Sequence, residues 1–198
     1  MKKIICFVIL FTGFCAFGQI REKGSIELAP FLGVGIANYY SGDAGSGNES
    51  ITSVNFGATG DYYFNSRWSL RSALMYQTMG TKFADTEDRL NYITVPVNAN
   101  WHFGSTRKWH LNFGPSFSFL TKAEATVGGR TFDVKDEIES FQIGLSYGLG
   151  YKFQINEKFG LAISYNENLG LSNVSKSNDF SFRNSHSAFN LSAVFLLD

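Results

Sequence analysis

Residues 141–153 read FQIGLSYGLGYKF, in which large apolar residues alternate with small or polar ones. Phe141 and Leu145 belong to the apolar set, and Gly148 and Lys152 belong to the other set. A period of two residues predicts a β-strand with one apolar face. The stretch exceeds the roughly five or six residues common in globular sheets and reaches the roughly 9–11 that cross a bilayer at a tilt. We therefore interpret it as a membrane-spanning strand.

The same alternation recurs along the chain from residue 24 onward. It marks eight segments, which are 24–40, 53–64, 68–79, 90–103, 109–122, 140–153, 159–170 and 185–197. The connections between them alternate in length: the long ones are 41–52, 80–89, 123–139 and 171–184, and the short ones are 65–67, 104–108 and 154–158. Outer-membrane barrels have short periplasmic turns and long external loops. We expect an all-β fold, an eight-stranded antiparallel up-and-down transmembrane β-barrel with both termini in the periplasm.

The composition argues against several other classes of protein. The chain has 198 residues with 17 Lys and Arg against 17 Asp and Glu, and only 17% of its residues are charged. Average soluble proteins have roughly 25%. Without a basic surplus, we expect no nucleic-acid partner. Aromatic residues at 16% and 20 glycines, placed in short alternating runs, fit β structure better than a disordered chain or a helical bundle.

The N-terminal segment 1–18 has the features of a secretory signal peptide. A pair of lysines precedes an apolar run, and Ala16 and Gly18 supply the small residues of a cleavage site. The run is shorter than the roughly 18 apolar residues of a spanning helix, which disfavours an uncleaved anchor. We expect cleavage and a mature outer-membrane barrel domain of residues 19–198 that begins at Gln19. Both cysteines lie in the removed segment, so the mature chain has no disulfide.

Two observations place the apolar set on the outside of the barrel, against lipid. Eight strand glycines share the polar set, with Gly60 as the exception, and a narrow lumen needs residues without bulk. The strand charges also lie in the polar set, except for Glu167 near a loop end, and a charge facing lipid at the midplane costs roughly 2–4 kcal/mol. A soluble ligand-carrying barrel would turn the apolar set inward, but these large side chains would leave no room for a ligand. We expect a polar, filled lumen.

Aromatic residues of the apolar set gather beside the short turns. A belt of aromatic side chains at the level of the headgroups is typical of membrane proteins. The preference of aromatic residues for strands explains their number but not this placement. The predicted periplasmic girdle consists of Trp68, Trp101, Trp109, Tyr151, Phe153 and Phe159.

Charged and titratable residues of the polar set gather near the same end of the barrel. The predicted lumen cluster consists of Glu27, Asp61, Arg71, His102, His110 and Lys152. Two acids, two fixed bases and two imidazoles could form one charge-paired layer, because buried charges persist only when they are paired. We interpret the layer as a structural plug, since eight strands enclose only enough space for side chains. A gate that opens by rearrangement of its ion pairs is the functional alternative.

Little in the sequence supports an enzyme. His186 lies between Ser185 and Ser187 near the external surface, where an acyl-transferring barrel would keep its nucleophile and base. A His–Ser neighbourhood needs an oriented third group, and none is evident. No strand–GxGxxG–helix context indicates nucleotide binding, and no His, Asp or Glu cluster has metal-site spacing. We expect no catalytic residue, no cofactor and no metal.

Four segments resemble the PorT-like outer-membrane β-barrel family of Bacteroidota. They are LNYITVPVNANWHF (90–103), LNFGPSFSFLTKA (111–123), FQIGLSYGLGYKF (141–153) and ISYNENLGLSNVS (163–175). The resemblance implies an outer-membrane protein, usually without an assigned activity, and one branch resembles a component of type IX secretion. It carries over no catalytic residue. Pro96 and Pro115 remove ladder donors from two of these segments, so we expect bulges or local bends there.

The predicted protein works in the outer membrane through its four long loops. We expect a structural, adhesion or surface-interaction role, with outer-membrane lipid and lipopolysaccharide as surroundings and other envelope proteins as candidate partners. An accessory component of protein secretion is the alternative function. A surface acyl-transfer enzyme is a distant third hypothesis.

Overall fold

The computed structural model describes residues 20–40, 47–177, 179 and 181–197. The predicted signal peptide and its cleavage site before Gln19 lie outside the described residues. Along the described chain, no helix is long and apolar enough to cross a membrane. The elements are β1 (Ile26–Tyr40), β2 (Ile51–Tyr63), β3 (Trp68–Phe83), β4 (Thr86–Phe103), β5 (Trp109–Val127), β6 (Arg130–Asp133), the 3₁₀ helix η1 (Lys135–Glu137), β7 (Phe141–Gln154), β8 (Phe159–Gly170) and β9 (Arg183–Leu197).

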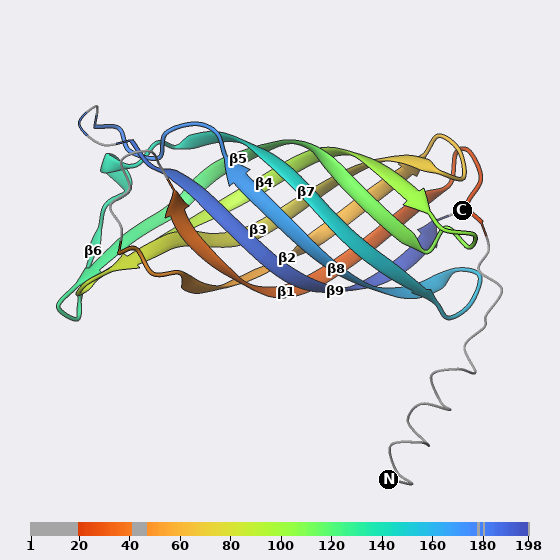
Figure 1. Cartoon of the computed structure of the whole chain (residues 1–198), viewed down its shortest axis with the longest axis horizontal. Helices are drawn as coiled ribbons and strands as arrows, with labels where there is room; N and C mark the ends of the chain where they lie inside the picture. Colours follow the sequence, from red (N-terminus) through yellow and green to blue (C-terminus); the bar gives the residue numbers. More distant parts are fainter. Residues whose placement is uncertain (1–19, 41–46, 178, 180, 198) are drawn as a thin grey trace, which may run out of the picture.

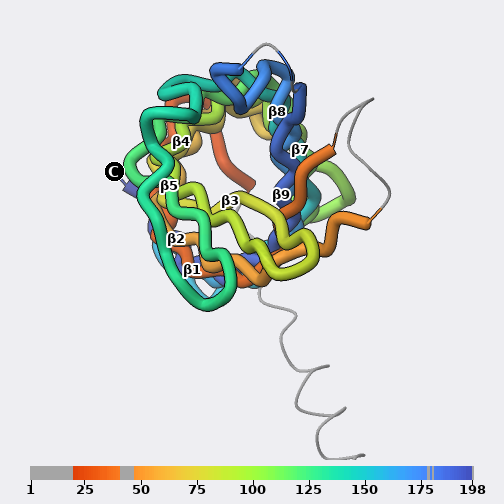
Figure 2. The backbone as a smooth tube through the Cα atoms, turned by 90° about the vertical axis from the view of Figure 1, so that its left-hand side faces the viewer, coloured from red at the N-terminus to blue at the C-terminus, as the bar shows by residue number. Residues whose placement is uncertain are grey.

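Eight of these strands close into an antiparallel barrel. Hydrogen-bonded neighbours follow the order β4-β3-β2-β1-β9-β8-β7-β5, and the pairing of β4 with β5 joins the two ends. Figure 1 shows the tilted strands from the side, and Figure 2 shows the ring end-on. Closure leaves no open sheet edge within the ring, which is what a strand structure needs in lipid. The predicted eight-stranded barrel is confirmed.

The two faces of the barrel wall follow the predicted alternation. Along β7, exposed and buried residues alternate from Phe141 to Gly150. Large apolar side chains face outward, and Leu32 and Phe189 are 62% and 63% exposed. Polar side chains such as Asn112 are buried inside. The apolar exterior and polar interior are those of a barrel that has lipid as its outer solvent.

Inward glycines let neighbouring strands approach closely. A Cβ atom added at Gly57 would lie 2.2 Å from the carbonyl oxygen of Leu74. One added at Gly33 would lie 1.8 Å from Oδ1 of Asn190. At Gly60, the exception in the sequence, an added Cβ would meet nothing within 4 Å. The inward glycines therefore provide the space that neighbouring backbone and amide side chains occupy.

The two ends of the barrel differ in the length of their connections. Short turns join β2 to β3, β4 to β5 and β7 to β8 at the end where β1 begins and β9 ends (Figure 1). This is the periplasmic end, because short turns of outer-membrane barrels face the periplasm. At the opposite, external end, β5 continues to Val127 and pairs with β6, so that part of the predicted loop 123–139 is a hairpin.

The predicted loop 80–89 is also mostly strand. β3 continues to Phe83 and β4 begins at Thr86, so only Ala84 and Asp85 connect them, with Ala84 at a φ of 50°. The Gly, Asp and Thr residues of this segment indicate a loop when read alone. The hairpin rises beyond the bilayer, where water replaces lipid and a polar outward face is tolerated.

At the two prolines the β4–β5 ladder is interrupted but contains no bulge, and the expected local bend stays a prediction. Between β4 and β5, Pro96 pairs with Ser116 and the next pair is Ala99 with Phe113, in the same register. The ladder is therefore interrupted without a shift. The register shift of this strand pair lies between Asn91 and Tyr92, near the external end. A missing donor at proline removes single hydrogen bonds, and the flanking pairs hold the alignment.

Candidate functional site in the barrel lumen

All six predicted lumen residues lie inside the barrel near its periplasmic end. Each comes from a different strand, and their side chains are almost fully buried, with His102 at 0% and Asp61 at 3% exposed. The cross-strand register brings them to similar levels: Glu27 pairs with Asp61, Asp61 pairs with Arg71, and His102 pairs with His110.

The first ion-pair cluster surrounds Glu27. Its carboxylate accepts hydrogen bonds from Nζ of Lys152, from Nε of Arg21 at 2.7 Å and from the hydroxyl of Tyr63 at 2.9 Å. Lys152 also donates to the Tyr63 hydroxyl at 2.6 Å. Two cations and one hydroxyl therefore satisfy one buried carboxylate, which is the condition under which a charge is retained inside a protein.

The second ion-pair cluster surrounds Asp61. Arg71 donates from Nε at 3.1 and 3.2 Å and from Nη2 at 2.8 Å. Oδ1 of Asp61 also accepts from Ser69 Oγ and from Asn100 Nδ2, each at 2.8 Å. The planar guanidinium makes a forked, charge-assisted contact that fixes both side chains.

The two imidazoles lie beside these clusters and form no hydrogen bond with either carboxylate. Nε2 of His102 is 2.9 Å from Ser69 Oγ, and its ring stacks on Tyr63 at a centroid distance of 4.8 Å. The ring of His110 is 6.3 Å from that of His102. The predicted residues are thus arranged as two ion-pair clusters with imidazoles alongside.

Sequence reasoning missed two members of the first cluster. Arg21 precedes β1, outside every alternating segment, so the pattern gave no reason to place it in the lumen. Its Nη2 also donates to Gln154 at 3.3 Å, which ties the chain before β1 to the end of β7. Tyr63 belongs to the inward set of β2, and a large aromatic residue on the polar side was a signal that could have identified it.

The buried charges of the two clusters do not cancel. Arg21, Arg71 and Lys152 supply three cations against the carboxylates of Glu27 and Asp61, which leaves one positive charge when the histidines are neutral. Removal of one partner from a buried ion pair costs about 3–5 kcal/mol, because an uncompensated charge stays inside. The two clusters therefore tie together five positions, four in strands and one before β1. The loss of any one of these charges should strongly destabilise the fold.

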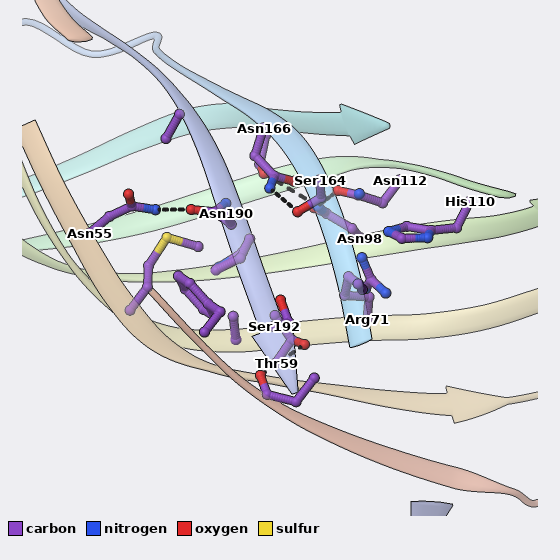
Figure 3. Close-up of a pocket in the computed structure, with 18 of the residues that line it drawn as sticks. Asn55, Thr59, Arg71, Asn98, His110, Asn112, Ser164, Asn166, Asn190 and Ser192 are labelled. Carbon is purple, nitrogen blue, oxygen red and sulfur yellow. Dashed lines mark hydrogen bonds between the residues drawn. The ribbon is translucent and has the colours of Figure 1, made fainter. Parts of the chain in front are cut away.

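Two cavities lie on either side of the Glu27–Lys152 pair, and both residues line both cavities. The periplasmic vestibule is also lined by Tyr63 and His102. The central chamber has room for only about five water molecules. Figure 3 shows the chamber, whose labelled side chains are Asn55, Thr59, Arg71, Asn98, His110, Asn112, Ser164, Asn166, Asn190 and Ser192.

The external end of the lumen is filled by apolar side chains, which we call the external lid. Strands contribute inward residues and the two connections that precede β7 and β9 contribute the rest. The lid consists of Ala37, Tyr39, Ile51, Met79, Leu90, Tyr92, Leu120, Ala123, Ile138 and Val174, with Val134 and Phe182 packed against it. The central chamber is thus bounded by charges on one side and by apolar packing on the other.

Backbone hydrogen bonds hold the lid in place. The amide of Glu139 donates to the carbonyl of Val174 at 2.8 Å, and the amide of Val174 donates to the carbonyl of Phe182 at 2.9 Å. The ring of Phe182 lies 4.6 Å from that of Tyr39 in β1. These contacts join both connections across the barrel mouth, so the external opening is covered by folded chain.

The residues around position 186 do not form the pair that an acyl-transfer site would need. His186 faces the lumen, where its Nε2 is 2.8 Å from Ser53 Oγ. Ser185 and Ser187 face outward and donate to the carboxylate of Glu167, Ser185 at 3.0 Å. The barrel wall therefore separates the two serines from the imidazole. The outward Glu167 is satisfied by hydroxyl groups, including that of Tyr165 at 2.9 Å.

The predicted periplasmic girdle forms a nearly continuous belt of ring contacts. Trp68 stacks on Trp101 at 6.4 Å, and Trp109 contacts Tyr151 edge-on at 4.9 Å. Tyr151 in turn contacts Phe153 at 4.8 Å. The three tryptophans are 36–44% exposed on the outer face. Amphipathic rings at this level anchor a barrel at the membrane surface.

Among the described residues, no group of three or more His, Cys, Asp or Glu side chains is arranged to hold a metal ion. The fold and the lumen define a class of protein: a small transmembrane β-barrel filled by its own side chains. The model of the outer membrane protein beta-barrel domain matches residues 17–176, and the chain belongs to that family. It is an integral outer-membrane protein.

Solved structures of other outer-membrane barrels share the fold. OprG from Pseudomonas aeruginosa is 10% identical with a TM-score of 0.55, over 89% of this chain and 97% of that chain. Neisserial surface protein A is 18% identical with a TM-score of 0.53, over 87% and 97%. Ail, the attachment invasion locus protein of Yersinia pestis, is 15% identical with a TM-score of 0.50, over 87% and 99%. No curated protein matches the sequence.

Proposed function

We propose that the protein is a surface-interaction protein: its barrel is an anchor in lipid and lipopolysaccharide, and its external hairpins contact other surfaces. The observation that carries the proposal is a lumen blocked twice, by the two ion-pair clusters and by the external lid. A barrel with such a lumen does not need to conduct. At the outer end, β3, β4 and β5 continue beyond the mouth of the barrel.

The projecting hairpins carry exposed apolar side chains, which we call the hairpin-tip patch. Phe83 is 53% exposed, Val127 is 48% exposed and Phe132 is 53% exposed. The register places Thr86 opposite both Phe83 and Val127, so the patch spans neighbouring strands at one level. Apolar groups gathered on a water-facing surface mark interaction sites. This patch lies above the lipid, so lipid tails are not its partner.

A test of this role compares the adherence of cells that carry the wild-type protein or a triple variant, Phe83→Ser with Val127→Ser and Phe132→Ser. The measurement is the fraction of cells that partition to hexadecane droplets. We expect wild-type cells to partition more than vector-only cells and the variant to lose that gain. Lys122→Ser, an outward polar residue of β5, is the matched control and should change nothing.

Equal surface amounts are verified by heat-modifiable migration, because a folded barrel migrates differently before and after boiling. Equal partitioning of wild-type and vector-only cells would contradict the proposed role. Planar-bilayer recordings of the refolded protein provide a second check. A stable pore would contradict the blocked lumen and favour the gate instead.

We also propose, as a second candidate, an accessory role in protein secretion within the PorT-like branch of Bacteroidota. The four motif segments quoted above support this placement. A specific observation favours a periplasmic surface: the short turns carry Arg67, Arg107, Lys108 and Lys158. A basic rim attracts acidic partners by complementary potential. Cross-linking and co-purification from native membranes should recover other envelope proteins, and Arg67→Glu with Lys158→Glu should lose them.

Export and processing belong to the same proposal. We expect the protein isolated from membranes to begin at Gln19, because the small residues before it fit a signal-peptide cleavage site. Intact-mass measurement of the purified protein tests this expectation. A mass that includes residues 1–18 would instead indicate an uncleaved anchor. An enzymatic activity is not part of the proposal, since the wall separates Ser185 and Ser187 from His186.

A further inference from the structure

The periplasmic vestibule is lined mainly by cations. The charged side chains that line it are those of Arg21, Arg107, Lys108 and Lys152 and of one acid, Glu27. Among the described residues, four cations against one carboxylate leave three positive charges. Both oxygens of that carboxylate already accept hydrogen bonds. Glu22 and Glu157, at the same end of the barrel, are exposed and do not line the vestibule. An anion that enters it therefore meets a positive wall.

Two short turns bring hydrogen-bond donors into the vestibule. Ser66 lies between β2 and β3, and Thr106 and Arg107 lie between β4 and β5. The two hydroxyls form no hydrogen bond within the described chain. Nη1 of Arg107 donates to the carbonyl of Gly104, and its Nε is buried, whereas Nη2 is accessible and has no partner within the described chain. One guanidinium nitrogen and two hydroxyls are therefore available to donate to an oxyanion.

The backbone of Arg107 is strained. Its φ is 54°, in the left-handed region that favours glycine. Ala84 is the other non-glycine residue of the described chain with a positive φ. Strain of this kind is concentrated at functional sites, where the side chain has a task that glycine cannot perform. The turn thus keeps an arginine in a conformation that glycine would adopt more easily.

The vestibule is small and opens at the periplasmic end. Its enclosed part has room for only about one or two water molecules, so a single anionic group fits and the rest of a larger ligand would extend into the periplasm. The Glu27–Lys152 pair closes the inner side, since both residues also line the central chamber. A ligand would therefore bind at the mouth of the barrel without passing through it.

We infer that the periplasmic vestibule binds a terminal phosphate group, that of inorganic phosphate or of a phosphomonoester. One oxygen accepts from Nη2 of Arg107, and the others accept from the hydroxyls of Ser66 and Thr106. A phosphate dianion offsets most of the positive charge of the wall, and it has enough oxygens for all three donors. A carboxylate has one charge and two oxygens, so it satisfies the wall less well. This site is independent of the proposed surface role of the hairpins.

Isothermal titration of the purified mature protein in dodecyl maltoside micelles tests the inference, with inorganic phosphate as the probe at about pH 8, where it is a dianion. The sample contains neither phospholipid nor another protein, so the result does not depend on the proposed surface or secretion roles. We expect saturable binding of one phosphate per barrel. Acetate and dimethyl phosphate carry one negative charge each and should bind at least tenfold more weakly. Dimethyl phosphate represents the phosphodiester of a lipid headgroup.

Two variants locate the site, each with a matched control. Arg107→Gly should abolish saturable binding, while the urea midpoint of unfolding should not fall, because glycine relieves the positive φ. Its control is Lys23→Gln, which removes a positive charge from an exposed residue at the same end and outside the vestibule. Thr106→Val should weaken binding about tenfold through the loss of one hydrogen bond to a charged group. Its control is Ser105→Ala, which removes an exposed hydroxyl of the same turn. Both controls should bind phosphate as the wild type does.

Every sample must show heat-modifiable migration, so that binding is measured on folded barrels. No saturable phosphate binding to the wild-type protein would overturn the inference. Unchanged binding in Arg107→Gly, or an equal loss in Lys23→Gln, would also overturn it, because the basic end would then attract anions without a defined site. Equal affinity for dimethyl phosphate would overturn the assignment to a terminal phosphate and indicate lipid headgroups. If Arg107→Gly lowered the urea midpoint, equal binding by Thr106→Val and Ser105→Ala would overturn the site.

Discussion

The two ends of the lumen are filled by opposite chemistry. At the periplasmic end, Glu27 and Asp61 are buried with three cations in charge-assisted contacts. At the external end, Leu90 and Tyr92 are 0% exposed in an apolar lid. Both regions close the same tube with side chains from the same strands. They differ because the outside of the barrel faces lipid at one level and water at the other.

Within the bilayer, the strands are apolar outward and polar inward. Above it, the polarity inverts along β3 and β4: Met79 and Leu90 face inward, whereas Lys82 and Arg89 face outward and Arg89 pairs with Glu87 at 2.5 Å. Beyond the membrane, a strand has the usual pattern of a soluble protein, with an apolar inward face and a polar outward face. The level of inversion therefore marks the outer edge of the hydrocarbon region on the sequence itself.

The largest effect is expected where a charge loses its partner. Arg71→Met leaves Asp61 buried without its guanidinium and should lower the free energy of unfolding by about 3–5 kcal/mol. Arg67→Met at the exposed turn should change it by less than about 0.5 kcal/mol. Urea titration of the protein in phospholipid vesicles, followed by tryptophan fluorescence, measures both. Equal midpoints for the two variants would show that the ion pair contributes no stability.

The external lid should respond to lost volume rather than to lost charge. Leu90→Ala creates a cavity in the lid and should cost about 3 kcal/mol. The matched control is Leu74→Ala on the lipid-facing side, where Leu74 is 63% exposed and lipid fills the space. The control should cost less than half as much in the same urea titration. A larger cost for Leu74→Ala would mean that the lid is loosely packed.

The boundary between the two regions can be probed by two substitutions of an amide by leucine. Asn100→Leu removes a hydrogen bond to the carboxylate of Asp61 and should cost about 2 kcal/mol. Gln77→Leu removes a bond to Thr94, which still contacts Ser118 at 2.8 Å, and places an apolar side chain next to the lid. We expect a change within about 1 kcal/mol. If Gln77→Leu cost more than Asn100→Leu, the boundary between the charged and the apolar parts of the lumen would lie nearer the periplasm.

The smallest effect is expected from the part of the lid that a connection contributes. Phe182→Ala removes the ring contact with Tyr39 and should lower stability by about 1 kcal/mol. Hydrogen exchange should rise around Val174 and Phe182, because in the described part of this connection these two side chains pack into the lid. Exchange in β7 should be unaffected. Uniformly faster exchange throughout the barrel would show that the lid and the strands unfold as one unit.

Much of this arrangement can be predicted from the sequence, because alternation in a membrane strand reports which side each residue faces. That pattern identified the outward Trp68 and the inward Arg71, and it placed all six lumen residues on the correct side of the wall. It did not specify partners. Whether Lys152 or Arg71 pairs with Glu27 depends on strand tilt and register, which a period of two does not contain.

The remaining features escaped prediction for physical reasons. Arg21 lies before β1, where no alternation exists to orient it. The lid lies at the level where the outside of the barrel faces water instead of lipid. The strands there are no longer apolar on the outside, so a search for that pattern ends before the lid and interprets 80–89 as a loop. Ile138 and Val174 belong to connections whose path depends on packing against the mouth. Local sequence determines the strands, and tertiary contacts determine how the tube is closed.

The position of the external lid also constrains the order in which the molecule assembles. Its residues come from β1, β2, β3, β4 and β5, and from the connections before β7 and β9, and all of them lie at the end of the barrel opposite the one where β1 begins and β9 ends. Each must be translocated before it can meet the others. The lid is therefore the last part of the protein to fold. When it forms, it buries the inward side chains at the external ends of the strands, which have just emerged into water.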